Sequence, residues 1–131
     1  MDLLLDTNLL IFSAQGSLPE DAEPLVADEE NRLFYSVASF WELSIKYGSG
    51  KLALPMEPWL LMEGLKENGY RELPITGDHV YTLGSLADIH RDPFDRIMVA
   101  QAVSENLIFL TTDETAAKYG QNVRLLKKPA Q

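Results

Sequence analysis

The chain has 131 residues, enough for a single domain with a sizeable core, and 46% of them are hydrophobic, which argues against disorder. It has no cysteine and 2 histidines, which excludes disulfides and thiol catalysis and disfavours histidine-rich zinc centres. A formal net charge of −9 has the wrong sign for a protein that binds nucleic acid through its overall charge. Oxygen ligands are abundant instead, and they suit Mg²⁺ or Mn²⁺.

Nothing in the sequence indicates secretion or a membrane span. No basic segment precedes the apolar run at 3–12, Asp6 interrupts that run, and no stretch reaches the roughly 18 apolar residues of a spanning helix. The lack of cysteine fits a reducing compartment. We therefore expect one domain over residues 1–131, soluble and cytoplasmic, with no membrane partner.

Short apolar runs alternate along the chain with segments of helical periodicity. In chain order they predict a strand at 3–5, a helix at 9–14, an acidic helix at 20–31, a strand at 33–35, helices at 36–47 and 59–67, a strand at 70–75, helices at 78–86 and 93–105, a strand at 107–110, a helix at 113–119 and a strand at 123–126. Continuous short apolar strands separated by helices are typical of a three-layer α/β/α domain with a central parallel sheet.

Four acidic residues fall on one edge of this predicted sheet. Asp6 ends the first strand, Glu42 lies early in the helix after the second, Asp95 lies in the first turn of the helix at 93–105, and Asp113 follows the strand at 107–110. Each also has a purely structural explanation. Asp6 and Asp113 can cap helices, Ser39 and Glu42 match a capping box, and Asp95 follows a helix start at Asp92 and Pro93.

The four acids together favour a metal site. At about 4 Å, two carboxylates repel by roughly 4 kcal/mol at an effective dielectric near 20, and bound cations offset this cost. Mg²⁺ or Mn²⁺ held by carboxylates supports phosphodiester hydrolysis without a histidine or serine nucleophile. The expected catalytic and metal-binding residues are therefore Asp6, Glu42, Asp95 and Asp113.

Several motifs resemble one known family. They are Leu4-Leu5-Asp6-Thr7-Asn8, Ser36-Val37-Ala38-Ser39-Phe40-Trp41-Glu42 with Lys46, His90-Arg91-Asp92-Pro93-Phe94-Asp95-Arg96, and Leu110-Thr111-Thr112-Asp113. In order and spacing they resemble PIN domains, and more narrowly the VapC-type toxins of type II toxin–antitoxin systems. The resemblance implies a Mg²⁺-dependent endoribonuclease that is inhibited by a cognate antitoxin and is usually a homodimer, with RNA as substrate. It also implies that the same four acids form the site, with Asp6 and Asp95 as the firmest metal ligands. Asn8 and Ala87 depart from the family pattern, which often has histidine and proline there.

For each of five further polar residues the sequence leaves two or three roles open. Thr7 and Thr111 can orient carboxylates or bond the backbone at strand ends, and Lys46 can meet a phosphate or pair with Glu42 on the helix surface. Arg96 can contact RNA, an antitoxin carboxylate or a surface acid, and Asn8 can touch metal, substrate or backbone.

Two histidines and three large apolar residues are assigned to structural roles. We expect His90 to anchor a loop by hydrogen bonding rather than to bind metal, and His79 to lie on a helix surface. We expect Trp41 and Phe94 in the core rather than stacked on bases. Core packing is likewise favoured for Trp59 and Met62 over contact with a partner helix.

Two other classes of function compete with the nuclease. A phospho-acceptor signalling domain of the receiver type shares a parallel sheet and strand-end acids with Mg²⁺. It needs an acidic pair at the first strand end and a lysine ending a late strand, whereas Asp6 stands alone and Thr111 and Thr112 occupy the late strand end. A non-catalytic interaction module is the third class, and the presence of all four acids argues against it.

Overall fold

The computed structural model describes residues 1–128, and five strands form its centre. The strands are β1 (Asp2–Leu5), β2 (Arg32–Ser36), β3 (Arg71–Leu73), β4 (Ile108–Thr111) and β5 (Val123–Leu125). The helices are α1 (Thr7–Ala14), α2 (Glu23–Ala27), α3 (Val37–Gly48), α4 (Pro58–Glu67), α5 (Gly77–Leu83), α6 (Pro93–Glu105) and α7 (Glu114–Ala117).

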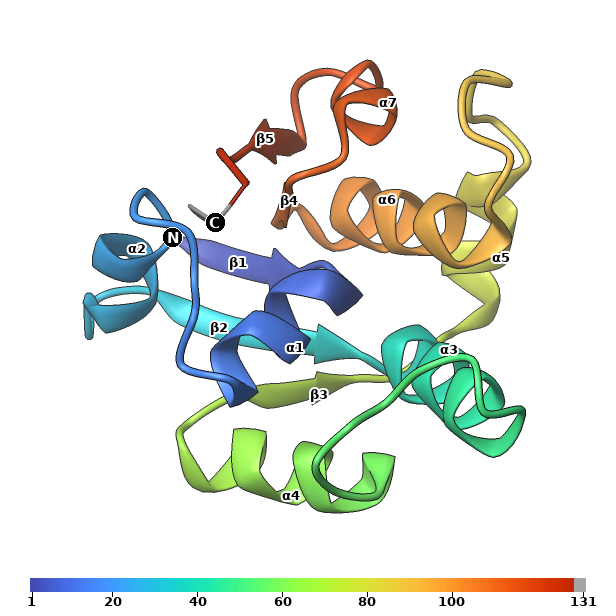
Figure 1. Ribbon diagram of the computed structural model, residues 1–131. Helices are drawn as coiled ribbons and strands as arrows, with labels where there is room; N and C mark the ends of the chain where they lie inside the picture. The colour runs from blue at the N-terminus through green and yellow to red at the C-terminus, as the bar shows by residue number, and fades with distance from the viewer. Residues whose placement is uncertain (129–131) are drawn as a thin grey trace.

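The strands form one sheet in the order β3-β2-β1-β4-β5, and every neighbouring pair is parallel. β1 is central, with Leu4 opposite Phe34 of β2 and Phe109 of β4. All strands therefore end at the same edge of the sheet, toward which the arrows of β1, β2 and β3 point on the right of Figure 1. The predicted α/β fold with a central parallel sheet is confirmed.

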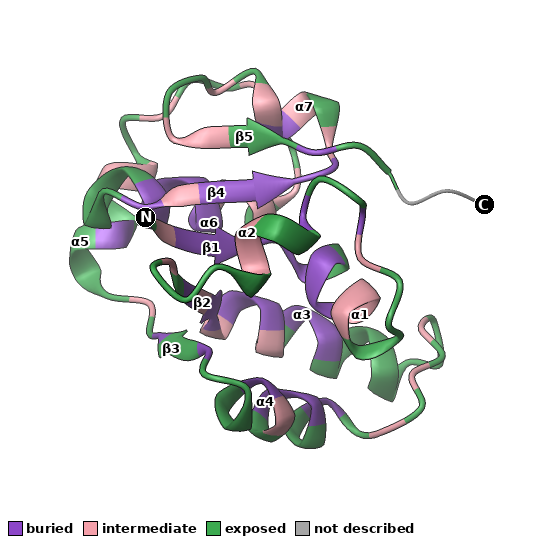
Figure 2. Cartoon of the chain, turned by 90° about the vertical axis from the view of Figure 1, so that its left-hand side faces the viewer, coloured by how far each residue is buried: buried purple, intermediate pink, exposed green. Residues whose placement is uncertain are grey.

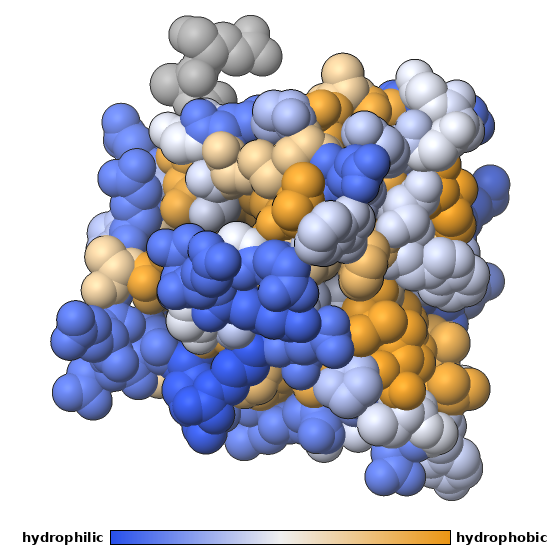
Figure 3. Space-filling view, turned by 90° about the horizontal axis from the view of Figure 1, so that it is seen from below, coloured by the Kyte–Doolittle hydropathy of each residue, from blue (hydrophilic) through white to orange (hydrophobic). Residues whose placement is uncertain are grey.

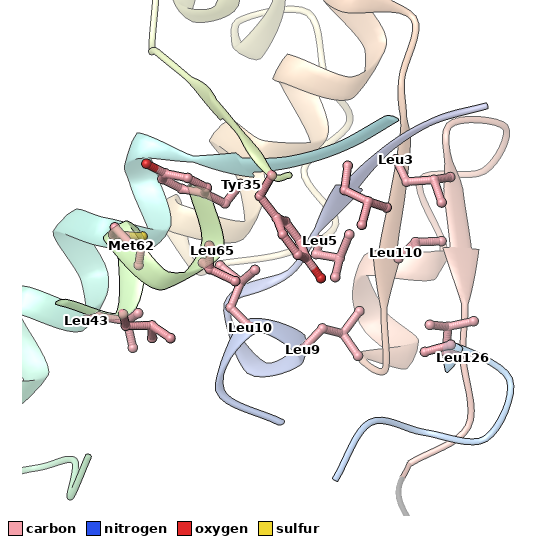
Figure 4. Close-up of a cluster of buried hydrophobic side chains, with 14 residues drawn as sticks. Leu3, Leu5, Leu9, Leu10, Tyr35, Leu43, Met62, Leu65, Leu110 and Leu126 are labelled. Carbon is pink, nitrogen blue, oxygen red and sulfur yellow. The ribbon is translucent and has the colours of Figure 1, made fainter. Parts of the chain in front are cut away.

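Alternate side chains of the strands enter two separate cores, one on each face of the sheet. Leu3, Leu5 and Tyr35 pack against Leu9 and Leu10 of α1 and against the buried side of α4 (Figure 4). On the other face, Leu4 and Phe109 pack against α6. Figure 2 shows β1 and β4 buried between these helical layers, which explains why their sequences are continuously apolar.

Proline and polar caps set the ends of α6. Asp92 accepts the N–H of Phe94 as the N-cap, Pro93 occupies the first turn, and Asn106 ends the helix in the left-handed conformation with φ 56°. The predicted range 93–105 is therefore confirmed. The other predicted elements are found with their ends moved by a few residues, except in the acidic segment.

The predicted acidic helix at 20–31 is wrong in extent, because only Glu23–Ala27 is helical. Pro24 lacks an N–H, and its ring would meet the carbonyl of residue 20 in a longer helix. After the helix, Asp28 accepts the N–H of Glu30 in a tight turn. The six acids of this segment, Glu20, Asp21, Glu23, Asp28, Glu29 and Glu30, are all exposed.

Within residues 1–128, none of the helices combines the length and the apolar character needed to cross a bilayer.

Candidate active site

The four predicted acids lie at or just beyond the edge where the strands end. Asp6 directly follows β1 and caps α1, while Asp113 follows β4 and caps α7. Asp95 lies in the first turn of α6, and Glu42 lies in the second turn of α3. Ser36, rather than Ser39, is the N-cap of α3, so the predicted capping box of Ser39 and Glu42 is wrong. Glu42 is thereby free to face the other acids.

Asp6 is buried, with only 4% of its surface exposed, and both of its carboxylate oxygens accept hydrogen bonds. Oδ1 accepts the backbone N–H of Thr7 at 2.7 Å, and Oδ2 accepts the hydroxyl of Thr111 at 2.6 Å. Burial is the largest effect and raises the pKa of Asp6 to about 6, although these two hydrogen bonds act in the opposite direction. The hydroxyl of Thr111 thus orients a site carboxylate, as one of its two readings predicted.

Glu42 is buried as well and is held by a chain of hydroxyl groups. Thr7 Oγ1 donates to Glu42 Oε1 at 2.7 Å, and Ser39 Oγ lies 2.8 Å from the same Thr7 oxygen. Because a hydroxyl has one proton, Ser39 donates to Thr7 while Thr7 donates to Glu42. The other oxygen, Oε2, accepts from Lys46 Nζ at 2.7 Å. Lys46 therefore pairs with Glu42 from the exposed surface of α3, while the carboxylate of Glu42 is buried.

Asp95 has the most strongly perturbed acidity of the four. Burial, followed by the negative charge of Asp6, raises the pKa of Asp95 to about 8. Asp92, Glu42 and Asp113 add to the same effect. At neutral pH the metal-free site therefore disfavours full ionisation of this carboxyl group, as expected when several acids share one pocket.

Asp113 and Asp95 are linked by His90, a residue expected from the sequence to anchor a loop rather than to bind metal. His90 Nε2 lies 2.6 Å from Asp113 Oδ2 and 3.2 Å from Asp95 Oδ2, and the three groups lie within 4.8 Å of one another. His90 Nδ1 accepts the N–H of Asp92 at 3.0 Å, which leaves the ring proton on Nε2. His90 therefore donates to the carboxylates, so its lone pair is not available to a cation in this arrangement. The expectation of a loop-anchoring histidine is met, but the contacts with two site acids were missed.

The contacts of His90 favour the ionised form of Asp113. Burial opposes ionisation, but the hydrogen bond from His90 and the N–H of Thr115 outweigh it, so the pKa of Asp113 lies below its usual value. The site thus contains one acid that ionises readily, Asp113, next to two that resist ionisation, Asp6 and Asp95.

Arg96 has a different role from any that the sequence predicted. Its Nη1 donates to the carbonyl of Ala87 at 3.1 Å and to the hydroxyl of Tyr119 at 3.0 Å. The same hydroxyl accepts the backbone N–H of His90 at 2.9 Å. Arg96 and Tyr119 therefore hold the loop that carries His90. Asn8 is exposed and lines a polar cavity with Asp113, so it stands at the rim of the site.

Four structural assignments made from sequence need correction or refinement. Trp41 is 58% exposed and Trp59 is 52% exposed, so neither is a core residue, whereas Met62 is buried as expected. Phe94 is partly buried against the α6 core. His79 is buried rather than on the surface, because its ring completes the capping box of α5 by accepting the N–H of Thr76. A lone histidine in the first turn gave no pattern by which this cap could be recognised.

The family model of the PIN domain matches residues 3–122, and the chain therefore belongs to the PIN-domain family. Its fold is similar to that of toxin–antitoxin proteins of known structure. A VapBC complex of Salmonella typhimurium bound to DNA aligns with TM-score 0.71 and 20% identity over 97% of this chain and 98% of that chain. VapBC2 of Rickettsia felis, bound to a promoter DNA fragment, aligns with TM-score 0.70 and 17% identity over 98% and 99%.

A more distant structure is the PIN domain endonuclease Utp24, with TM-score 0.54 and 16% identity over 90% of this chain and 75% of that chain. No curated protein matches the sequence. At these identities the structural relatives establish a shared fold, the PIN-like fold of VapC-type proteins.

Proposed function

We propose that the protein is a Mg²⁺-dependent endoribonuclease, with Mn²⁺ as a possible substitute, and that it acts as the toxin of a toxin–antitoxin pair. The observation that carries the proposal is the convergence of Asp6, Glu42, Asp95 and Asp113 at one edge of the sheet, where burial raises the pKa of Asp95 to about 8. A carboxyl group that is costly to ionise in the metal-free protein becomes favourable to ionise once a cation is bound beside it, so the raised pKa of Asp95 supports a cation site.

The donor set fits a hard divalent cation. Carboxylate oxygens are the preferred ligands of Mg²⁺ and Mn²⁺, and each has two lone pairs, so the hydrogen bonds to Asp6 and Asp113 leave room for a metal. Asp6, Asp95 and Asp113 would hold the ion. Glu42 would contribute less, because each of its oxygens already accepts from Thr7 or Lys46.

When bound, such a cation supplies an activated water and neutralises charge on the scissile phosphate. The residues of the chain prepare the site for this role. Thr111 and the N–H of Thr7 fix Asp6, while Ser39 and Thr7 fix Glu42. The cationic Lys46 offsets one carboxylate, and the donor His90 separates Asp113 from Asp95. These contacts fix the carboxylates in place before the substrate arrives.

An antitoxin as partner is supported by the likeness to toxin–antitoxin complexes of known structure. RNA as substrate is part of the proposal and rests on the resemblance of the sequence motifs to VapC-type toxins. We further propose that the protein is a homodimer and that its antitoxin is a separate protein. Light scattering of the purified chain, alone and with the candidate antitoxin, tests both statements.

A receiver-type signalling domain is the alternative, and the order of the strands weighs against it. Receiver domains have the doubly wound order 2-1-3-4-5. The order here is β3-β2-β1-β4-β5, so the first strand is central. A non-catalytic interaction module remains distinguishable by the absence of turnover.

The test is RNA cleavage by the purified protein, freed of any partner, in Mg²⁺, in Mn²⁺ and in EDTA. The proposal predicts cleavage that requires the metal and disappears in Glu42→Gln or Asp95→Asn. Glu29→Gln is a charge-matched control from the exposed acidic segment and retains activity. Metal-independent cleavage, or no cleavage of any RNA together with unchanged thermal stability on adding metal, contradicts the proposal.

A further inference from the structure

The ring of His90 stands between two of the acids that would hold the cation. Its Nε2 lies 2.6 Å from Asp113 Oδ2 and 3.2 Å from Asp95 Oδ2. One oxygen of each acid and a ring nitrogen of His90 all lie within 4.8 Å of one another. Two oxygens bound to the same Mg²⁺ lie at most about 4 Å apart, because each is about 2.1 Å from the ion. The ring N–H therefore takes up space of the size that a cation shared by the two carboxylates needs.

The hydrogen bonds of the ring make His90 a donor to these acids. Nδ1 accepts the N–H of Asp92 at 3.0 Å, so the proton is on Nε2. A neutral imidazole has one N–H, which cannot point straight at both carboxylates. The shorter distance assigns it mainly to Asp113, and the contact with Asp95 is the weaker of the two. An N–H dipole also offsets the charge of two carboxylates far less than a divalent cation does.

We propose that His90 is a positioning residue that takes the place of the cation in the protein without bound metal, and that it withdraws from Asp95 when the cation binds. This inference rests on the proposed function, because it needs a cation site at these acids. An interaction that stabilises the protein only before the metal binds is weakened on binding, and the metal affinity falls by the strength of what is given up. His90 therefore holds the two acids together without metal and lowers their affinity for it.

The two acids have supports other than His90. Asp113 Oδ1 accepts the N–H of Thr115 at 2.8 Å at the start of α7. Asp95 lies in the first turn of α6, a helix that Asp92 caps. Removing the imidazole N–H therefore takes away a donor without removing the elements that place the carboxylates.

The loop of His90 is anchored through the backbone. The N–H of His90 donates to the hydroxyl of Tyr119 at 2.9 Å, and Arg96 Nη1 donates to the same oxygen at 3.0 Å. Neither contact involves the imidazole ring, so both can persist when the ring gives up Asp95. The donor function of the ring and the anchoring of the loop can therefore be tested separately.

Two substitutions divide the hydrogen bonds of the ring between them. His90→Asn retains an acceptor near the position of Nδ1, but its amide is too short to reach the acids. His90→Gln retains an N–H near the position of Nε2 and lacks the Nδ1 acceptor. In isothermal titration calorimetry at neutral pH, His90→Asn is expected to bind Mn²⁺ about tenfold more tightly than the native protein, the equivalent of one hydrogen bond to a charged group. His90→Gln is expected to bind Mn²⁺ like the native protein.

Thermal melting in EDTA should change in the opposite direction. His90→Asn is expected to melt about 4 °C below the native protein, because it has lost a donor to two carboxylates. A residue with only a structural role would lower stability and metal affinity together, so tighter binding by a less stable variant is specific to the proposal. Tyr119→Phe is the control for the loop. It loosens the anchor, leaves the ring N–H in place and should leave the Mn²⁺ affinity unchanged.

The chain has 2 histidines, so imidazole NMR reports on His90 directly. His79 is the internal reference, because its buried ring contacts Thr76 and Glu105 rather than the site acids. In a long-range ¹H–¹⁵N spectrum, both rings are expected to carry the proton on Nε2. Saturating Mg²⁺ should move the Nε2–H signal of His90 upfield, as its hydrogen bonding weakens, and should leave that of His79 in place.

Three results would overturn the inference while the cation site stands. One is an unchanged His90 signal at Mg²⁺ concentrations that raise the melting temperature. Another is Mn²⁺ binding by His90→Asn that is equal to or weaker than that of the native protein. The third is a shift of the His90 proton to Nδ1 on adding Mg²⁺, which would make Nε2 a metal ligand.

Failure of the proposed function gives different results. If neither the native protein nor any variant binds Mn²⁺ or Mg²⁺, the cation site is refuted and the role of His90 is refuted with it. If the affinities and the His90 signal change as expected but no RNA is cleaved, only the nuclease proposal is lost.

Discussion

Carboxylates gather at both ends of the sheet, in very different surroundings. Near the end where the strands begin, Asp28, Glu29 and Glu30 follow α2 and are exposed to water just before β2 (Figure 1). At the end where the strands finish, Asp6 and Glu42 are buried and Asp95 is mostly buried. Neutral hydroxyl groups, Lys46 and His90 hold these carboxylates.

Because acids occur in both surroundings, the net charge of −9 does not indicate where the functional site lies. Much of that charge lies on solvated residues far from the site, and exposed charges contribute little to stability or to chemistry. Figure 3 shows a related asymmetry on the face seen from below: hydrophilic residues gather at the left and in the lower middle, and an apolar patch lies on the right, the side where Figure 1 draws α3. Neutralising a carboxylate should therefore have a large effect at the buried acids and a small effect in the exposed acidic segment.

The largest expected effect follows from neutralising one buried acid. Asp95→Asn or Asp6→Asn should reduce metal-dependent RNA cleavage by more than about 100-fold, because changes in outer-shell partners alone cost 10- to 100-fold. Initial rates on one RNA substrate measure it. Glu29→Gln removes the same charge from the exposed end and should change the rate less than about twofold. If Glu29→Gln lowered the cleavage rate as much as Asp95→Asn does, the buried acids would have no special role in cleavage.

The next effect concerns the hydroxyl that holds Asp6. Thr111→Val removes a 2.6 Å hydrogen bond that lowers the pKa of Asp6, so the pKa should rise further above about 6. We expect cleavage at pH 7 to fall by about tenfold, with the rising limb of the pH–rate profile displaced to higher pH. Thr82→Val is the control, since the Thr82 hydroxyl makes no hydrogen bond within residues 1–128. An unchanged profile in Thr111→Val would show that this contact has no role in ionising Asp6.

The pH dependence of stability distinguishes the two acidic regions without any assay of activity. Folding raises the pKa of Asp6 to about 6 and that of Asp95 to about 8, so the unfolded chain ionises these groups first. The metal-free protein should therefore lose stability as the pH rises from about 4 through about 8. Calorimetry in EDTA should show a melting temperature that falls over this range and a flatter profile for Asp95→Asn. The native slope should persist in Glu29→Gln, and a slope that is equally flat in all three proteins would contradict the assigned ionisation.

The smallest expected effect concerns the loop that carries His90. Tyr119→Phe removes the acceptor shared by His90 N–H and Arg96, which should cost about 1 kcal/mol and lower the melting temperature by about 4 °C. Cleavage should change by about twofold or less. Tyr81→Phe is the control, because Tyr81 is 86% exposed. A drop in activity as large as that of Asp95→Asn would place Tyr119 in the site itself.

Sequence patterns predicted most of the fold and brought the four acids to one edge. The apolar runs at 3–5 and 107–110 identified β1 and β4, and parallel connection then put Asp6 and Asp113 at the same end. Asp92 and Pro93 located the start of α6 to the residue. These features are local, so they can be read from a single sequence.

Features that depend on tertiary contacts were not predictable. The burial of His79 depends on how α5 packs against α6, and the link from His90 to Asp113 joins residues 23 positions apart. Trp41 is a large apolar residue of the kind usually found in a core, but it is 58% exposed and lines a cavity between α3, α5 and α6. That position depends on how the three helices pack. The helix predicted at 20–31 was too long because the acidic pattern continues on both sides of Pro24, whereas the proline limits the helix to Glu23–Ala27.

Thermal melting with and without Mn²⁺ tests whether the buried acids form a cation site. A cation that binds the folded state raises the melting temperature, and it should relieve the repulsion that raises the pKa of Asp95. We expect the melting temperature to rise by several degrees for the native protein and for Glu29→Gln, and little or not at all for Asp95→Asn. An equal rise in Asp95→Asn, or no rise in the native protein, would contradict a cation site at these acids.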